Sequence, residues 1–100
     1  MENKDINKMA LRMIYAQAID EISAEIEEEA EAILDSVLGF CVKAAGYPSA
    51  NTEITLPRAY FAKEEGARAA EVRHRVFKKL RDRDLKVSVD ELNGDVTISW

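Results

Sequence analysis

Apolar residues recur every three or four positions through the first 45 residues, which is the period of one face of an α-helix. They are Leu11, Tyr15, Ala18, Ile22, Ile26, Ala30, Ile33, Val37, Cys41 and Ala44. Leu11, Ile22 and Ile33 are also eleven residues apart, a spacing that completes three helical turns and keeps the stripe nearly straight along the helix. The pattern predicts a helical segment over residues 1–46.

The length of this helix raises a question of packing. About 40 residues at 1.5 Å each give a rod of roughly 60 Å, whereas a compact domain of about 100 residues has a radius of gyration of about 13 Å. Two arrangements resolve the difference. The helix breaks near Asp20–Ser23 or at Gly39, or a second copy of the protein covers the protruding stripe.

Three short runs in the second half alternate between apolar and polar residues, as strands with one buried face do. The first run is residues 52–56, which ends before a proline. The other two, residues 85–89 and 96–100, lie on either side of Asn93-Gly94, a dipeptide that favours a hairpin between strands. We predict a strand for the first run and a β-hairpin for the other two, with Leu92 in a bulge or a longer turn.

Residues 62–83 have helical rather than strand spacing. Their apolar stripe consists of Ala69, Val72, Val76 and Leu80, with Phe77 beside it. The sequence therefore predicts one α+β domain over residues 1–100: a long N-terminal helix, continuous or broken, and then a β-α-β-β unit over residues 52–100 with a small three-stranded sheet. If the first two strands are parallel neighbours, the crossover between them is right-handed.

Charge changes this picture because it is separated along the chain. The whole sequence has 14 Lys+Arg against 19 Asp+Glu, a net charge of −5. Residues 20–35 contain eight acidic residues and no basic one, whereas residues 58–86 contain ten basic and five acidic residues, a net charge of +5. An acidic helix and a basic helix in one small chain predict complementary packing, within a molecule or between copies.

Each charged segment offers a candidate binding face. The acidic face consists of Glu25, Glu28, Glu29 and Asp35. It is either a solvated helix face or a docking surface for a basic protein partner. The basic face, a candidate site for phosphate or another anion, consists of Arg68, Arg75, Lys79 and Arg83. Direct nucleic-acid binding is disfavoured because the chain as a whole is acidic.

The sequence has no motif that is typical of catalysis, of a metal site or of a cofactor. It lacks a Gly-x-Ser-x-Gly turn, a phosphate-binding glycine loop and a His-Glu-x-x-His pair. His74 is the only histidine, and Cys41 lies on the apolar face, as a small buried hydrophobic residue does. We therefore expect no enzymatic activity, no cofactor and no metal.

Location is predicted from what the chain lacks. A single cysteine excludes an intramolecular disulfide framework. No apolar run reaches the roughly 18 residues needed to cross a bilayer, and the acidic start is unlike a secretory leader. We expect a cytoplasmic protein with no membrane partner.

The second half of the chain has a characteristic ending. Its helix closes with Lys79-Leu80-Arg81-Asp82-Arg83-Asp84, and the strands read Leu85-Lys86-Val87-Ser88-Val89 and Val96-Thr97-Ile98-Ser99-Trp100. This ending resembles small proteins encoded by tailed bacteriophages. The resemblance implies a virion or assembly component, or an accessory factor that binds a host protein, located in the host cytoplasm or in the virion.

Two hypotheses of different classes follow. The first is a non-enzymatic protein that assembles into a homo-oligomer through its N-terminal helix. Its self-association seam would consist of Ile22, Ile26, Ile33 and Val37, with Trp100 as a core or interface anchor. The alternative is a small inhibitor or sequestering factor that binds a host protein or a phosphorylated ligand through its acidic or basic helix face.

Overall fold

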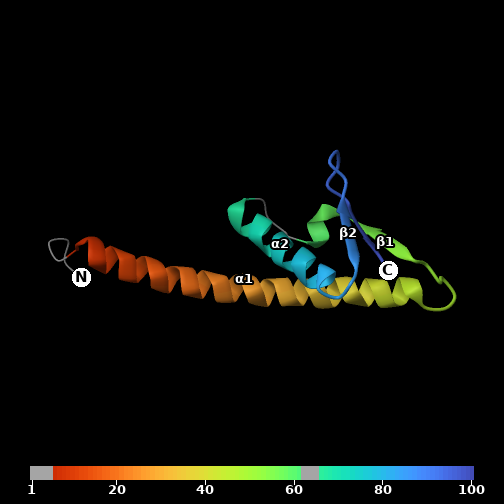
Figure 1. The fold of residues 1–100 in the computed structure, drawn as a ribbon, viewed down its shortest axis with the longest axis horizontal. Helices are drawn as coiled ribbons and strands as arrows, with labels where there is room; N and C mark the ends of the chain where they lie inside the picture. The colour runs from red at the N-terminus through yellow and green to blue at the C-terminus, as the bar shows by residue number, and fades with distance from the viewer. Residues whose placement is uncertain (1–5, 62–65) are drawn as a thin grey trace.

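A computed structural model describes residues 6–61 and 66–100 of the chain. It shows an α+β fold with a long N-terminal helix, a second helix and a three-stranded sheet, which confirms the predicted fold class (Figure 1). The elements are α1 (Lys8–Ala45), β1 (Glu53–Leu56), the 3₁₀ turn η2 (Arg58–Tyr60), α2 (Ala67–Arg81), β2 (Lys86–Val89) and β3 (Val96–Ser99). Residues 62–65 of the predicted second helix lie outside the described residues.

Helix α1 is one unbroken helix of 38 residues, so of the two arrangements left open by the sequence, the break near Asp20–Ser23 or at Gly39 does not occur. The side chain of Asn7 begins the helix by accepting a hydrogen bond from the Ala10 amide at 2.9 Å. The helix ends at Gly46, whose amide donates to the Val42 carbonyl at 3.1 Å. The molecule is accordingly elongated, 67 × 25 × 19 Å, with a radius of gyration of 18.4 Å against the roughly 13 Å of a compact domain of this size.

Gly39 offers a test of this continuous helix. A Cβ atom at Gly39 would meet nothing within 4 Å, so Gly39→Ala removes backbone freedom from the unfolded chain without a clash. We expect the free energy of unfolding to rise by about 0.5–1 kcal/mol, measured by chemical denaturation. Gly94→Ala is the control, because Gly94 has φ +76° and its Cβ would lie 2.9 Å from Arg58 Cδ, so this variant should lose stability. A loss of stability in Gly39→Ala would contradict the continuous helix.

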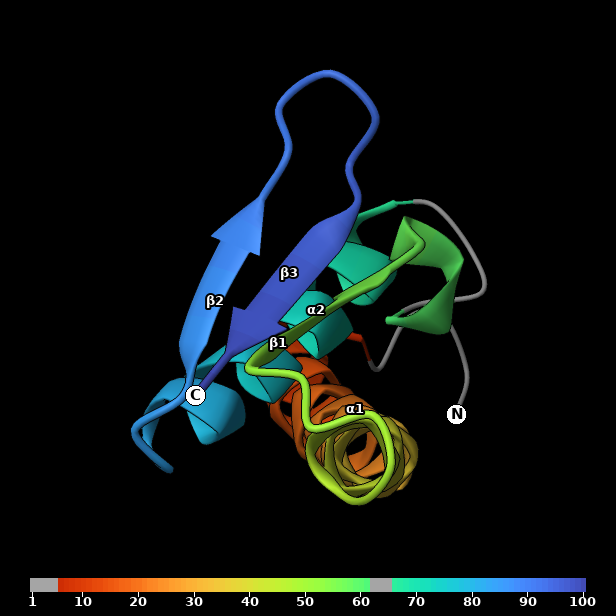
Figure 2. The same ribbon diagram turned by 90° about the vertical axis from the view of Figure 1, so that its right-hand side faces the viewer.

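The sheet has the order β1-β3-β2, and both of its strand pairs are antiparallel. Ile98 in β3 pairs with Ile54 on one side and with Val87 on the other. Strands β1 and β2 are therefore parallel but not neighbours, because β3 lies between them (Figure 2). The right-handed crossover was predicted only for the case that these two strands are adjacent. Because they are not adjacent, that prediction does not apply.

The predicted hairpin between β2 and β3 is present, with a longer turn than two residues. The turn is held by side chains near its tip: Asp90 Oδ1 accepts from the Leu92 amide at 2.8 Å, and Asn93 Oδ1 accepts from the Asp95 amide at 2.9 Å. Gly94 has a positive φ of 76°, a conformation that glycine adopts without strain. Leu92 is at the solvent-exposed tip, as the longer-turn alternative predicted.

One core joins both helices to one face of the sheet (Figure 2). It consists of Ile26, Ala30, Leu34, Val37 and Cys41 from α1, Phe61 after η2, Val72, Val76 and Leu80 from α2, and Val96 and Ile98 from β3. The other face of the sheet is polar, and there the hydroxyls of Thr55 and Thr97 are hydrogen-bonded at 2.9 Å. Only residues from Ile26 onward in α1 belong to this core, so the N-terminal part of the helix is left outside it.

Candidate interaction surface

The N-terminal part of α1 extends away from the rest of the molecule as a bare helix, which we call the arm and define as residues 8–22 (Figure 1). The next residue, Ser23, is the point at which α2 reaches α1, since Arg75 donates to its carbonyl and its hydroxyl. Residues 23–61 and 66–100 form the body.

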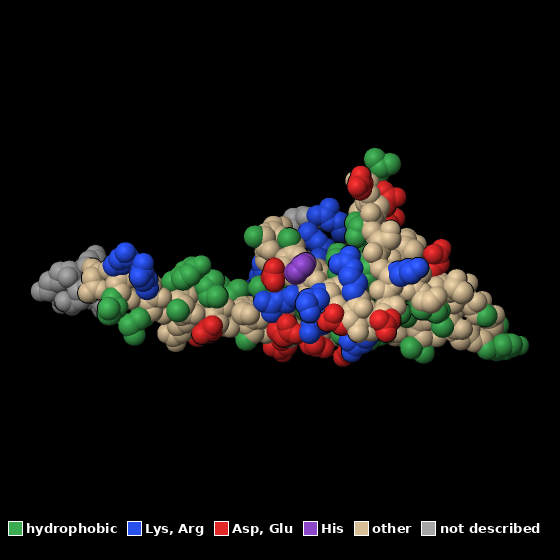
Figure 3. Space-filling view, in the orientation of Figure 1, with side chains coloured by type: hydrophobic (Ala, Val, Ile, Leu, Met, Phe, Trp, Pro, Cys, Tyr) green, Lys and Arg blue, Asp and Glu red, His purple; other side chains and the backbone are tan. Residues whose placement is uncertain are grey.

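The arm exposes large apolar side chains. They are Met9, Leu11, Met13, Ile14, Tyr15, Ile19 and Ile22, each between 41% and 73% exposed. They follow one another along the arm, and green side chains are visible along it in the space-filling view (Figure 3). Single exposed apolar residues are ordinary, but a contiguous set is typical of a surface that another molecule covers.

The structure corrects the predicted self-association seam. Ile26 and Val37 are only 6% and 1% exposed, because α2 and the sheet of the same chain cover them. Ile33 is partly buried against that core. Ile22 and Trp100 remain exposed, and Trp100 extends the pairing of β3 with β1 through a 3.0 Å bond from its amide to the Thr52 carbonyl. The stripe is thus divided: its C-terminal part is internal, and its uncovered part is the arm.

Sequence reasoning placed Leu11, Tyr15 and Ile22 of the arm on the stripe but missed Met9, Met13, Ile14 and Ile19. Their signal was present in the sequence. These residues lie off the stripe, so that the first helical turns are apolar around more than one side. An apolar surface over a wide arc is typical of a helix that becomes buried against other elements or another molecule.

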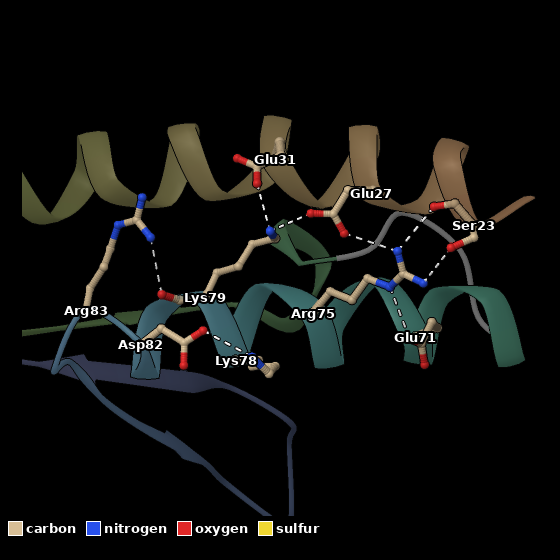
Figure 4. A network of polar contacts seen from close by, with 9 residues as sticks. All are labelled: Ser23, Glu27, Glu31, Glu71, Arg75, Lys78, Lys79, Asp82 and Arg83. Carbon is tan, nitrogen blue, oxygen red and sulfur yellow. Dashed lines mark hydrogen bonds and ion pairs between the residues drawn. The ribbon is translucent and has the colours of Figure 1, made fainter. Parts of the chain in front are cut away.

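The acidic and basic segments meet within one molecule, where α1 and α2 run alongside each other (Figure 4). The Arg75 guanidinium is central: Nη1 donates to the Ser23 carbonyl at 3.2 Å and to Glu27 Oε2 at 3.1 Å, and Nη2 donates to Ser23 Oγ at 3.1 Å. Its Nε donates to Glu71 Oε1, one turn earlier in α2, at 3.1 Å. One planar cation therefore fixes the position of α2 against α1.

Two further cations complete this contact. Lys79 lies between two carboxylates of α1, bonded to Glu27 and to Glu31, the latter at 2.8 Å. Arg68 pairs with Glu25 at 3.1 Å. We call the set of Ser23, Glu25, Glu27, Glu31, Arg68, Glu71, Arg75 and Lys79 the charged contact. The sequence predicted that the acidic helix packs against the basic helix, and the charged contact shows that this packing occurs within one molecule.

The charged contact changes the interpretation of both predicted charged faces. Of the basic face, Arg68, Arg75 and Lys79 are engaged with carboxylates of α1, and Arg83 donates to the Lys79 carbonyl at 3.4 Å. Three of the four cations therefore already have anionic partners, which disfavours phosphate binding on this face.

The acidic face is divided in the same way. Glu25 pairs with Arg68, and Glu29 lies 4.0 Å from the same guanidinium. Glu28 and Asp35 are exposed. Two of the four predicted carboxylates are thus available to a basic partner. Other carboxylates of α1 are paired with cations of α2.

Glu27 makes stability depend on pH. The hydrogen bond from Lys79, reinforced by Arg75, lowers the pKa of Glu27 below its ordinary value of 4.5. The ionised carboxylate therefore stabilises the fold fully above about pH 4.5, and this contribution is lost as the pH falls through the lowered folded pKa. We expect Glu27→Gln to lower the melting temperature at pH 7 and to lower it less at pH 3.

The measurement is thermal denaturation of both proteins at the two pH values. Glu28→Gln, an exposed neighbour on α1, is the matched control and should change the melting temperature little at either pH. A deficit in Glu27→Gln of the same size at pH 3 and pH 7 would show that ionisation of Glu27 does not stabilise the helix contact.

The remaining candidate groups form no further site. Burial raises the pKa of the Cys41 thiol, which disfavours the reactive thiolate. His74 is exposed on α2. Within residues 6–61 and 66–100, no group of three or more His, Cys, Asp or Glu side chains is arranged to hold a metal ion. None of the helices in that described part is both long enough and apolar enough to cross a membrane.

Comparison of the chain with protein-family models, with curated proteins and with solved structures gives no match.

Proposed function

We propose that this protein is a non-enzymatic assembly protein that self-associates through the arm. The observation that carries the proposal is the row of seven exposed large apolar side chains on a helix that no described part of the body covers. Burying such a row removes apolar surface from water at about 25 cal/mol per Å², and a second copy of the chain brings an equivalent row with it.

The arm also has a structural reason to be covered. A helical segment of about 15 residues is marginally stable alone in water, and its packing against other elements supplies most of the stability of such a helix in a protein. The arm continues, without a break, the part of α1 that packs in the core. Its helical conformation is therefore stabilised before any partner binds. Its large apolar side chains lack a partner among the described residues.

The charged faces support the alternative function less well. An inhibitor that captured a basic protein or a phosphorylated ligand would need free carboxylates or free cations. Glu25, Arg68, Arg75 and Lys79 are engaged with one another across the charged contact or with neighbouring carboxylates. The resemblance of the second half of the chain to small proteins of tailed bacteriophages implies two roles, and of these the exposed apolar residues of the arm favour the assembly component.

The test is molar mass by light scattering over a range of protein concentrations. We expect a mass above the 11.2 kDa of one chain, rising with concentration and persisting in 1 M salt, where the Debye length is about 3 Å and charge-led association weakens. Leu11→Asp should restore the mass of a single chain, because it introduces a carboxylate into the apolar row.

Gln17→Asp is the matched control, since it adds the same charge to the arm about 120° around the helix from Leu11. It should leave the larger mass unchanged. Circular dichroism checks that the body stays folded in both variants, as expected for positions outside the core. A mass of one chain at every concentration, or an unchanged oligomer in Leu11→Asp, would overturn the proposal.

A further inference from the structure

Building on the proposed self-association, we infer that two arms pair antiparallel about a two-fold axis that passes between Ala16 and Gln17. The two bodies then lie at opposite ends of a two-headed rod. Three properties of the arm carry this inference: the order of its apolar residues, the order of its charges, and the position of the acidic run that follows it.

Five of the seven exposed apolar residues of the arm lie on one side of the helix, and their order is nearly the same in both directions; Met9 and Met13 lie on the other side. Reversal about the midpoint between Ala16 and Gln17 places Leu11 level with Ile22, Ile14 level with Ile19, and Tyr15 level with Ala18. An interface on a two-fold axis uses the same patch on both copies, so the patch must be complementary to itself. These three pairs meet this condition, and all of their residues except Ala18 are large apolar side chains that are exposed.

The charges of the arm favour the antiparallel direction. Lys8 and Arg12 lie in its first half, and Asp20 and Glu21 lie at its end. An antiparallel pair brings the basic half of one arm level with the acidic end of the other. In a parallel pair, each charged residue would instead lie beside the same residue of the other copy, so that like charges would repel each other at every charged position. The antiparallel pair also sets the helix dipoles head to tail.

The acidic run limits how far the arms overlap. Residues 20–35 contain eight acidic residues and no basic one. Sliding the axis toward the body, for example to residue 25, would place the two acidic runs against each other. The same run disfavours a membrane as the partner of the arm. Anionic lipid repels both the acidic end of the arm and a chain with a net charge of −5. The overlap that satisfies both apolar and charged residues is therefore confined to the arm.

The arrangement predicts distances that can be measured between spin labels. Asp35, exposed on the body side of α1, is 18.5 residues from the axis, so two copies of it would be roughly 55 Å apart along the rod. In a parallel pair, with helix axes 8–10 Å apart, the same labels would be roughly 25 Å apart. Gln17 lies beside the axis, and labels there would be roughly 25 Å apart in either arrangement.

The experiment is pulsed dipolar spectroscopy on the full chain in two variants, Gln17→Cys and Asp35→Cys, each nitroxide-labelled in a Cys41→Ala background. We expect a distance near 25 Å at position 17 and near 55 Å at position 35. A short distance at both positions would overturn the antiparallel pairing while leaving self-association intact.

The other outcomes separate the two proposals. No dipolar coupling at position 17, together with the molar mass of one chain, would refute self-association itself and the pairing with it. A distance at position 17 that arises only when vesicles of anionic phospholipid are added would show that a membrane gathers the arms, and would likewise overturn the inference. Unlabelled Asp35→Cys and Gln17→Cys should retain the oligomeric mass of the parent chain.

Discussion

Phe61→Ala is expected to lower the free energy of unfolding by about 3–5 kcal/mol, the range for loss of a fully buried aromatic side chain. Phe61 is 0% exposed and is the largest side chain in the core that is fully buried. Its ring centroid lies 5.3 Å from that of Phe77 at an interplanar angle of 59°, so its removal opens a cavity and also leaves the Phe77 ring without this contact. For a chain of about 100 residues, whose total stability is about 5–15 kcal/mol, this is a large share.

Tyr60→Ala provides the matched control next to it in the sequence. Tyr60 is 48% exposed and touches Phe40 edge-on, with ring centroids 5.4 Å apart. Its truncation should cost about 1 kcal/mol, since an aromatic pair contributes about 0.5–1.5 kcal/mol beyond the burial of its area. Denaturant unfolding of both variants decides the matter. Equal losses would mean that Phe61 is not the anchor that joins the segment after β1 to the core.

Ala30→Leu is expected to lower the free energy of unfolding by about 1–3 kcal/mol, because added methylene groups in a filled core force side chains and backbone to shift. Ala30 is 0% exposed and belongs to the core cluster. It lies on α1 between Glu27 and Glu31, which both bond Lys79 of α2. A larger side chain there would press α2 away from α1 and lengthen the ion pairs of the charged contact.

The control for this substitution is Ala24→Leu, at an exposed position of the same helix. Alanine and leucine have similar helix propensities, so this variant should leave stability nearly unchanged. If Ala30→Leu were equally harmless, tight packing of the core around Ala30 would be refuted. The arm lies outside this region, and Ala30→Leu should therefore change the molar mass only at temperatures where the body unfolds.

The body and the long helix both follow from local patterns in the sequence, but the continuity of that helix does not. Alternation around Ile54, Val87 and Ile98 predicted three strands, and these residues pair across the sheet in one row. Gly39, by contrast, weakens a helix by about 1 kcal/mol at most, which 38 residues of helix with a packed C-terminal half can absorb. A single glycine was therefore a poor signal for a break.

The predicted self-association seam lay on α1, but two of its residues, Ile26 and Val37, belong to the core of the same chain. Ile26 and Val37 have the apolar character that a self-association seam needs, and a core needs the same character, so residue type alone does not say which molecule covers them. The spacing of the charged residues indicates the packing of the two helices more directly than the apolar residues do. Glu27 and Glu31 are four residues apart, as are Arg75 and Lys79, and this matched spacing favours two helices that lie side by side.

The order of strands in the sheet has a consequence for the route by which the chain folds. β3 pairs with β2 across a short turn, whereas Ile54 of β1 pairs with Ile98 across 44 positions of sequence. Closing the longer loop costs more chain entropy, so the hairpin should form first and β1 should add to it later. Trp100, the one tryptophan of the sequence, bonds through its amide to Thr52 beside β1. Its fluorescence is therefore a built-in reporter of that slower step.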